Sequence, residues 1–218
     1  MGQLTFDLGH RPAFGRDDLL VAPGNSEAVA WVDRWPAWPA HALAIFGPPG
    51  CGKSHLAQVF ALRADARVLD AAALENAHVA QLIEAHRCFV VEDGESLKDE
   101  RALLHLLNTV KERGGHVLLT SRIPPARWAV VLPDLKSRVA AVQAVGIAVP
   151  DDATMEAVLV KLFADRQIAV EPDVIAFLVR RIDRTFASAR DVVTRADQAA
   201  LVGKRAPTIP LLKQVLDG

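Results

Sequence analysis

The segment Gly47–Ser54 constrains this chain more than any other, because it reads Gly-Pro-Pro-Gly-Cys-Gly-Lys-Ser. Two glycines flank four residues and Lys-Ser follows, which is the spacing of a phosphate-binding P-loop. Such glycines let several backbone N–H groups converge on one anion, and the next helix directs its positive end to the same place. We expect Lys53 to reach the terminal phosphates of a nucleotide and the Ser54 hydroxyl to ligate Mg²⁺. A Gly-Pro turn with an accidental lysine is the alternative.

Around this loop, short apolar segments alternate with segments of helical periodicity. We expect strands at residues 41–46, 67–69, 88–91, 117–119 and 142–149, with helices at 53–64, 74–85 and 100–113. Unbroken apolar strands separated by helices favour a parallel sheet covered on both faces. After Pro150 the expected elements are helices, at 151–166, 173–183, 188–202 and 211–216. The sequence predicts an N-terminal arm at 1–13, a P-loop α/β domain with a five-stranded parallel sheet at 14–150, and a small all-helical domain at 151–218.

Polar residues follow two of the expected strands. Glu92 and Asp93 end one buried apolar strand, and paired carboxylates there are the second element of a P-loop site. We expect Glu92 to orient the shell of Mg²⁺ and Asp93 to polarise the attacking water. Thr120 and Ser121 end the next strand, where a hydroxyl can sense the γ-phosphate. The alternative for both pairs is that they are ordinary polar residues at strand ends, exposed to solvent and without a catalytic role.

Two arginines are candidates for stabilising charge on phosphates. Arg138 precedes the last expected strand, where a surface arginine can reach the nucleotide of a neighbouring subunit. Arg190 lies on a helix of the second domain, from which a cation can close over the phosphates. A solvated arginine is the alternative at either position.

Charge and cysteine content narrow the class of protein. The formal net charge is −1, which gives little support for DNA binding by the chain alone. No apolar run approaches the roughly 20 residues of a membrane span. The two cysteines are Cys51, inside the P-loop, and Cys88, at the start of an expected buried strand. This placement argues against a disulfide framework and favours the cytoplasm.

Taken together, these residues resemble an AAA+ ATPase of the DnaA family of bacterial replication initiators, over almost the whole chain. The matching segments are the adenine-side segment at 13–25, the P-loop, the sensor 1 strand with its proline exit at 117–125, and the arginine-finger box at 135–138. Three further segments resemble the Hda-like branch, which lacks the DNA-binding domain of the initiators: 3–8, 132–135 and 208–210. An autonomous helix-turn-helix is therefore not expected.

The resemblance implies an AAA+ fold with a helical lid, ADP or ATP with Mg²⁺, and an initiator as partner. The implied nucleotide-binding residues are Gly47, Pro48, Pro49, Gly50, Cys51, Gly52, Lys53, Ser54, His55 and Arg190. Hda-like proteins bind the sliding clamp of the replicase through an N-terminal motif, which here corresponds to Gln3, Leu4, Phe6 and Leu8. The ADP-bound protein on DNA-loaded clamp then stimulates hydrolysis of the ATP held by DnaA, with Arg138 as the finger in trans. A finger needs a neighbour, so a homo-oligomer or a hetero-complex is also expected.

Three positions depart from the family pattern. Glu92 replaces the usual aspartate, Arg122 stands where initiators often carry an acidic residue, and an ungapped alignment puts Ala187 rather than Arg190 at sensor 2. We therefore expect weak intrinsic hydrolysis in a protein that acts mainly on its partner. Two other readings are an AAA+ ATPase that loads a helicase or remodels replication proteins, and a DNA-binding initiator fragment. The arm favours the regulator, the altered acidic pair argues against a motor, and the neutral charge argues against a DNA binder.

Overall fold

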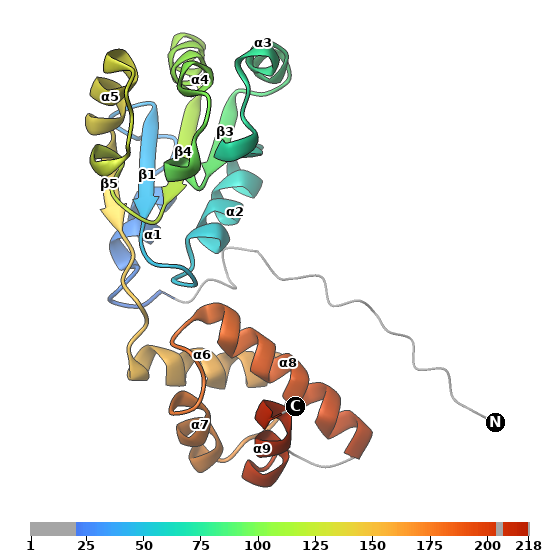
Figure 1. Cartoon of the computed structure of the whole chain (residues 1–218). Helices are drawn as coiled ribbons and strands as arrows, with labels where there is room; N and C mark the ends of the chain where they lie inside the picture. Colours follow the sequence, from blue (N-terminus) through green and yellow to red (C-terminus); the bar gives the residue numbers. More distant parts are fainter. Residues whose placement is uncertain (1–20, 204–206, 218) are drawn as a thin grey trace, which may run out of the picture.

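The computed structural model describes residues 21–203 and 207–217. Within these ranges, an α/β part is followed by a bundle of helices, which Figure 1 shows below the sheet. The arm residues Gln3, Leu4, Phe6 and Leu8 lie outside the described residues. The domain limits expected at residues 13 and 150 stay predictions.

Five parallel strands form one sheet in the order β2-β3-β4-β1-β5, which confirms the expected five-stranded parallel sheet. The strands are β1 (Ala42–Phe46), β2 (Arg67–Asp70), β3 (Cys88–Glu92), β4 (His116–Ser121) and β5 (Gln143–Gly146). Because all strands run the same way, the segments that follow β1, β3 and β4 meet at one edge of the sheet. The P-loop and both pairs of polar strand-end residues therefore share that edge.

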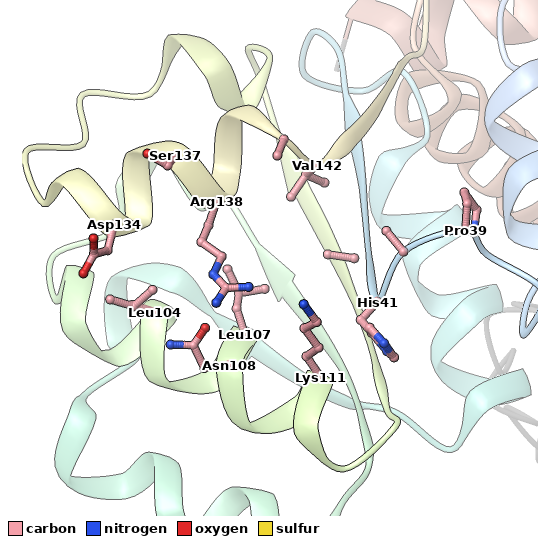
Figure 2. A pocket seen from close by; sticks show the side chains of 13 residues that line it. Pro39, His41, Leu104, Leu107, Asn108, Lys111, Asp134, Ser137, Arg138 and Val142 are labelled. Atoms are coloured by element: carbon pink, nitrogen blue, oxygen red, sulfur yellow. The ribbon is translucent and has the colours of Figure 1, made fainter.

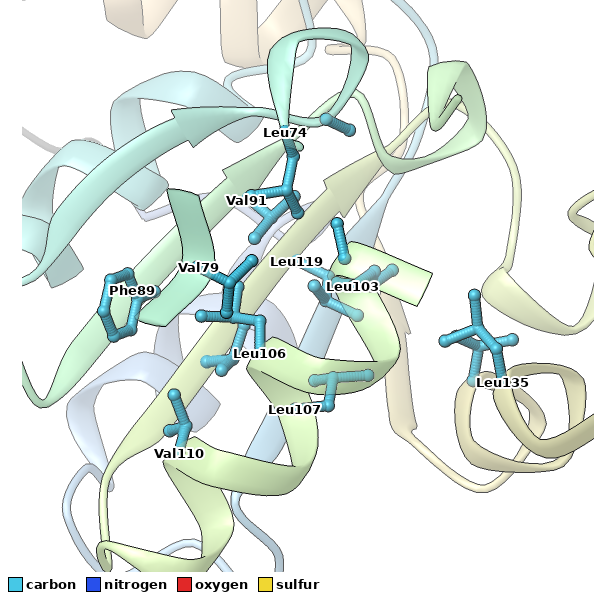
Figure 3. Packing of buried hydrophobic residues seen from close by; sticks show 14 of the residues in the cluster. Leu74, Val79, Phe89, Val91, Leu103, Leu106, Leu107, Val110, Leu119 and Leu135 are labelled. Atoms are coloured by element: carbon cyan, nitrogen blue, oxygen red, sulfur yellow. The ribbon is translucent and has the colours of Figure 1, made fainter. Parts of the chain in front are cut away.

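Helices cover both faces of the sheet, as the unbroken apolar strands predict. On one face lie α3 (Asn76–Ala85), α4 (Glu100–Glu112) and α5 (Pro133–Ala140), and on the other lie α1 (Ser26–Asp33) and α2 (Lys53–Ala64). Successive strand residues point to opposite faces, so Phe89 and Val91 pack against α3 and α4 whereas Val90 faces α2. Figure 3 shows the first of these cores, in which Leu103 and Leu106 of α4 lie over the sheet.

The sequence pattern and the structure differ most between β4 and β5. Helix α5 was not anticipated, because it is only eight residues long and buries only Leu135 and Val139. The strand expected at 142–149 is β5, which ends at Gly146. After that residue, the Ala148 N–H donates to the Gly24 carbonyl at 2.9 Å, so the chain turns toward the segment before α1 instead of extending the sheet.

The C-terminal helices form a lid with its own core. They are α6 (Asp152–Asp165), α7 (Pro172–Val179), α8 (Phe186–Gly203) and α9 (Ile209–Asp217). Their inward side chains make one cluster that includes Leu159, Phe163, Leu178, Val193 and Leu212. Asp151 begins the lid as the N-cap of α6, where its side chain accepts the Thr154 N–H at 2.8 Å.

Candidate nucleotide-binding site

The P-loop joins β1 to α2 through backbone conformations that glycine favours. Gly50 and Gly52 have φ of +74° and +104°, in the left-handed region that other residues rarely adopt. A Cβ added to Gly47 would lie 2.3 Å from the Ile147 carbonyl oxygen, so glycine is also needed for close approach to the end of β5. Helix α2 begins at Lys53 directly after this turn, which places its unpaired N-terminal N–H groups at the loop.

Lys53 is the buried cation of the loop. Its side chain is 9% exposed, and Nζ donates to the carbonyl oxygens of Gly47 at 2.8 Å and Pro48 at 2.9 Å. Among the described residues, no acidic side chain forms an ion pair with it. A buried ammonium is costly unless a negative charge offsets it. The buried Lys53 ammonium, the N-terminus of α2 and the exposed Ser54 hydroxyl therefore suit a polyphosphate. The contacts of Lys53 with the terminal phosphates and of Ser54 with Mg²⁺ stay predictions.

Cys51 packs inside the loop as a neutral thiol. Its side chain is 1% exposed and belongs to the core cluster under α2. Burial raises the pKa of the Cys51 thiol, and the nearby Lys53 ammonium opposes this shift only in part. A thiol with a raised pKa is a poor nucleophile at neutral pH, so Cys51 fills space in the loop.

The ends of β3 and β4 are tied to each other and to the P-loop. Asp93 directly follows β3 with φ of 52°, and its N–H donates to Oγ1 of Thr120 at 3.4 Å. Ser121 is fully buried, and its carbonyl accepts the Gly47 N–H at 3.1 Å. Its hydroxyl donates to the Ile123 carbonyl at 2.7 Å.

The structure therefore brings the predicted acidic tip and the predicted sensor strand together beside the P-loop. Glu92 ends β3 half-buried and Asp93 is exposed. Mg²⁺ in nucleotide sites is usually held by phosphates, water and one or two carboxylates. The carboxylate of Glu92 and the hydroxyl of Ser54 remain the predicted protein ligands.

The lid touches the P-loop through the start of α8. The Phe186 N–H donates to the Gly50 carbonyl at 3.2 Å. Atoms of the Phe186 ring lie 3.3 Å from the position of a Cβ on Gly52, and Thr185 lies 2.5 Å from one on Gly50. Neither Thr185 nor Phe186 was expected at the site from the sequence, because the helical pattern there begins at Ser188.

Arg190 reaches the helix that follows the P-loop. Its Nη2 lies 2.7 Å from Nδ1 of His55, which is 8% exposed. Arginine can only donate, so Nδ1 accepts and a neutral His55 carries its proton on Nε2. Of the two candidates for the sensor 2 position, Ala187 is uncharged, whereas Arg190 is a cation that contacts the helix directly after the P-loop. Its contact with the nucleotide stays a prediction.

A cavity of about 140 Å³ opens beside the P-loop, between the segment before α1, the exit of β5 and the lid. Its lining includes Gly24, Asn25, Ala148, Thr154 and Phe186. The predicted adenine-side segment 13–25 contributes the first two, and the residues after β5 were not anticipated.

Arg138 lies elsewhere, on α5 and exposed. Figure 2 shows it in a groove of about 720 Å³, together with His41, Asn108 and Lys111. The groove is lined by the residues that lead into β1, whereas the P-loop follows the opposite end of that strand. The structure therefore does not bring Arg138 to its own P-loop.

Comparison with known proteins identifies the lid and the fold. Residues 151–216 match the family model described as "Hda, lid domain". The whole chain is similar to domain III of the replication initiation protein DnaA from Thermotoga maritima, with a TM-score of 0.78, 19% identity, and coverage of 95% of this chain and 97% of that chain. AMPPCP-bound DnaA from Aquifex aeolicus gives a TM-score of 0.74 at 18% identity, covering 88% of this chain and 68% of that one.

A point mutant of RuvB from Thermotoga maritima gives a TM-score of 0.69 at 15% identity, covering 89% of this chain and 67% of that chain. At these identities, the structural similarities show the fold. In the described part of the chain, no helix is long and apolar enough to cross a membrane.

Proposed function

We propose that the chain is an Hda-like AAA+ protein of the DnaA family and, as such, an adenine-nucleotide-binding regulator of chromosomal replication initiation. The match of residues 151–216 to the Hda lid domain and the fold shared with DnaA domain III support this proposal. The chain binds ADP or ATP with Mg²⁺ at the P-loop and, together with the sliding clamp, stimulates hydrolysis of the ATP held by DnaA. It thereby limits initiation and works in the cytoplasm. The observation that carries this proposal is the position of Arg138, exposed in a groove away from the chain's own P-loop.

The nucleotide is held from three sides in this proposal. Lys53 and the N-terminus of α2 bind the phosphates, and the cavity of Gly24 and Ala148 takes the base. Arg190 approaches from the lid through His55. Bound nucleotide supplies the negative charge that the buried Lys53 ammonium lacks among the described residues.

Arg138 acts on the nucleotide of a neighbour. The groove around it also holds Lys111, and neither cation forms an ion pair with a described acidic residue. This groove therefore suits a partner that presents phosphates. An arginine finger supplied in trans raises the rate of phosphoryl transfer by about 10³–10⁵-fold. The proposed activity is the association of DnaA with this groove, rather than hydrolysis at the chain's own P-loop.

Intrinsic hydrolysis is proposed to be weak. Glu92 is one methylene longer than the aspartate usual at this position, which alters the place of the carboxylate that orients Mg²⁺. Asp93 is fixed by its own N–H to Thr120 and by its carbonyl, which accepts the Ser96 N–H at 2.8 Å.

The test is a reconstituted assay with DnaA that carries labelled ATP. Clamp on DNA is added, and hydrolysis is followed with and without this protein and ADP. A clamp-dependent rise is expected for the wild type and not for Arg138→Ala. Lys136→Ala, which removes an exposed cation from the same helix, is the matched control and should keep the rise.

Two results would contradict the proposal. Stimulation that survives Arg138→Ala shows that another residue supplies the charge. If wild-type protein binds nucleotide but gives no stimulation, a helicase loader or remodelling ATPase becomes the better interpretation. Binding to a replicative helicase would then be measured next.

A further inference from the structure

Several contacts hold the segment that joins β4 to α5, and two of them involve Trp128 and Glu100. In its middle, Trp128 is buried, and its Nε1 donates to the Ile123 carbonyl at 3.2 Å. At its end, the carboxylate of Glu100 accepts two successive backbone amides: Oε1 takes the Val131 N–H at 2.8 Å and Oε2 takes the Leu132 N–H at 2.6 Å. Glu100 is the first residue of α4, so this contact joins the start of α4 to the start of α5.

Backbone contacts add to side-chain packing at the point where α5 begins, since Val130 is buried in the core that contains α4 and Leu132 packs against that core. The Val131 side chain is 84% exposed and contributes little burial. Leu132 is the N-cap of α5 and offers no side-chain cap, and Pro133 in the first turn has no N–H. Further along the helix, Leu135 and Val139 are buried. The two bonds to Glu100 therefore act together with this packing, and they join the start of α4 directly to the N-terminal end of the helix that carries Arg138.

We propose that Glu100 is a positioning residue for Arg138. Its carboxylate binds both amides at the start of α5 and sets the angle of this eight-residue helix over α4, and with it the place of the guanidinium. Hydrogen bonds to a carboxylate are roughly twice as strong as bonds between neutral groups. A misplacement of about 1 Å at a reacting centre can lower a rate by about 10²-fold. The inference rests on the proposed function, in which Arg138 acts on a partner's nucleotide.

The variants are Glu100→Ala, which removes both acceptors, and Glu100→Gln, which keeps one acceptor in the same shape. Glu112→Ala is the matched control, because Glu112 ends the same helix and is exposed. Each protein is first tested for ADP affinity and melting temperature. Amide hydrogen exchange is then measured at Val131, Leu132 and along α5, and stimulation of the partner is measured as a function of protein concentration.

The expected result separates positioning from folding. Glu100→Ala raises exchange at Val131 and Leu132 about tenfold or more, because two charge-assisted bonds are lost. The maximal stimulated rate falls about 10- to 100-fold while ADP affinity and the half-saturating concentration stay near wild type. Glu100→Gln lies between wild type and Glu100→Ala, and Glu112→Ala matches wild type. In an Arg138→Ala background, Glu100→Ala causes no further loss, because there is no finger left to misplace.

Three outcomes overturn the inference. The first is full stimulation by Glu100→Ala despite faster exchange at Val131 and Leu132. The second is a parallel fall in melting temperature, ADP affinity and stimulation in both Glu100 variants, which indicates a purely structural role. The third is no stimulation by the wild type, which rejects the proposed function and the positioning role with it. In that third case the exchange data still report whether Glu100 holds α5, so the two failures are distinguishable.

Discussion

Arg190 of the lid donates from Nη2 to Nδ1 of His55 on α2 across 2.7 Å. His55 follows the P-loop on α2, whose N-terminus is part of the predicted phosphate site. A second link, from the Phe186 N–H to the Gly50 carbonyl, joins the same lid helix to the loop itself. The position of the lid and the shape of the P-loop are therefore coupled, and a ligand that binds one arrangement better biases both.

Removing Arg190 should weaken nucleotide binding through this coupling. Arg190→Ala is expected to raise the Kd for ADP about tenfold, because a charge-assisted contact beside the phosphates is lost. Binding is measured by titration calorimetry, with Arg180→Ala, an exposed lid arginine, as the control. In a double-mutant cycle with His55→Ala, we expect a coupling energy of about 0.5–3 kcal/mol. Additive effects would show that Arg190 does not act through His55.

Gly50→Ala should both strain the P-loop and push the lid away. The φ of Gly50 is +74°, and an added Cβ would lie 2.5 Å from Thr185. Gly114→Ala is the matched control, because Gly114 has φ of +67° with nothing within 4 Å of the added Cβ. We expect about 1 kcal/mol of destabilisation for Gly114→Ala from backbone strain alone, with ADP affinity unchanged.

For Gly50→Ala, a further loss of stability and weaker ADP binding are expected, because the clash adds to the strain. Denaturant unfolding and ADP titration measure both quantities. Equal effects of the two substitutions would mean that the lid contact at Gly50 contributes nothing.

The sequence was most informative where one local pattern determines structure. The P-loop spacing and the 3.6-residue periodicity after it placed a helix at 53–64, and α2 has these bounds. Unbroken apolar strands correctly indicated a parallel sheet with two covered faces. The start of α8 was placed two residues too late, since the helix begins at Phe186, which packs against the lid core and also lies over Gly52 of the P-loop.

Contacts between residues that are far apart in the sequence could not be predicted, because neither local sequence carries a pattern that indicates them. His55 and Arg190 are 135 residues apart, and nothing in either neighbourhood specifies the other. The bonds from Glu100 to Val131 and Leu132 use backbone N–H groups, which any residue except proline carries. Likewise, an exposed arginine such as Arg138 has the same local sequence whether it serves a partner or water. Tertiary structure is needed to separate these cases.

Asp99 should make stability depend on pH in the acidic range. It caps α4 by accepting the Ala102 N–H and also accepts the Asn76 N–H, which begins α3. The bond from Asn76, and then that from Ala102, hold the pKa of the Asp99 carboxyl below its ordinary value of 3.8. A lowered pKa in the folded state stabilises the fold above the ordinary pKa, and this contribution is lost as the pH falls below 3.8 toward the folded value.

Asp99→Ala is therefore expected to lower the free energy of unfolding at neutral pH by about 1 kcal/mol, the usual value of an N-cap. The variant should also lose less stability than wild type on acidification. Urea unfolding at a series of pH values measures both effects, with Asp217→Ala at the exposed end of α9 as the control. An unchanged acid dependence in Asp99→Ala would show that other carboxylates dominate.

The N-terminal arm should matter for the clamp alone. Gln3 and Phe6 belong to the segment proposed to dock on the sliding clamp as an extended peptide. Replacing both by alanine is expected to weaken clamp binding at least about tenfold, with ADP affinity and melting temperature unchanged. Replacing Thr5 and Asp7, which lie in the same segment, is the control. Surface-plasmon measurements on immobilised clamp check this, and equal binding by all variants would leave the arm without a role.

Lys53→Ala should remove nucleotide binding at the ADP concentrations that saturate the wild type, while keeping the fold. The buried ammonium is expected to donate to the phosphates, and truncating one partner of a buried, hydrogen-bonded charge pair costs about 2–5 kcal/mol. The Kd for ADP should therefore rise by roughly 30-fold or more.

Without nucleotide, the melting temperature should not fall, because a buried cation without an acidic partner among the described residues is itself destabilising. ADP should raise the melting temperature of wild type and of Lys98→Ala, an exposed control, but not of Lys53→Ala. ADP affinity retained by Lys53→Ala would refute the assignment of the phosphate site.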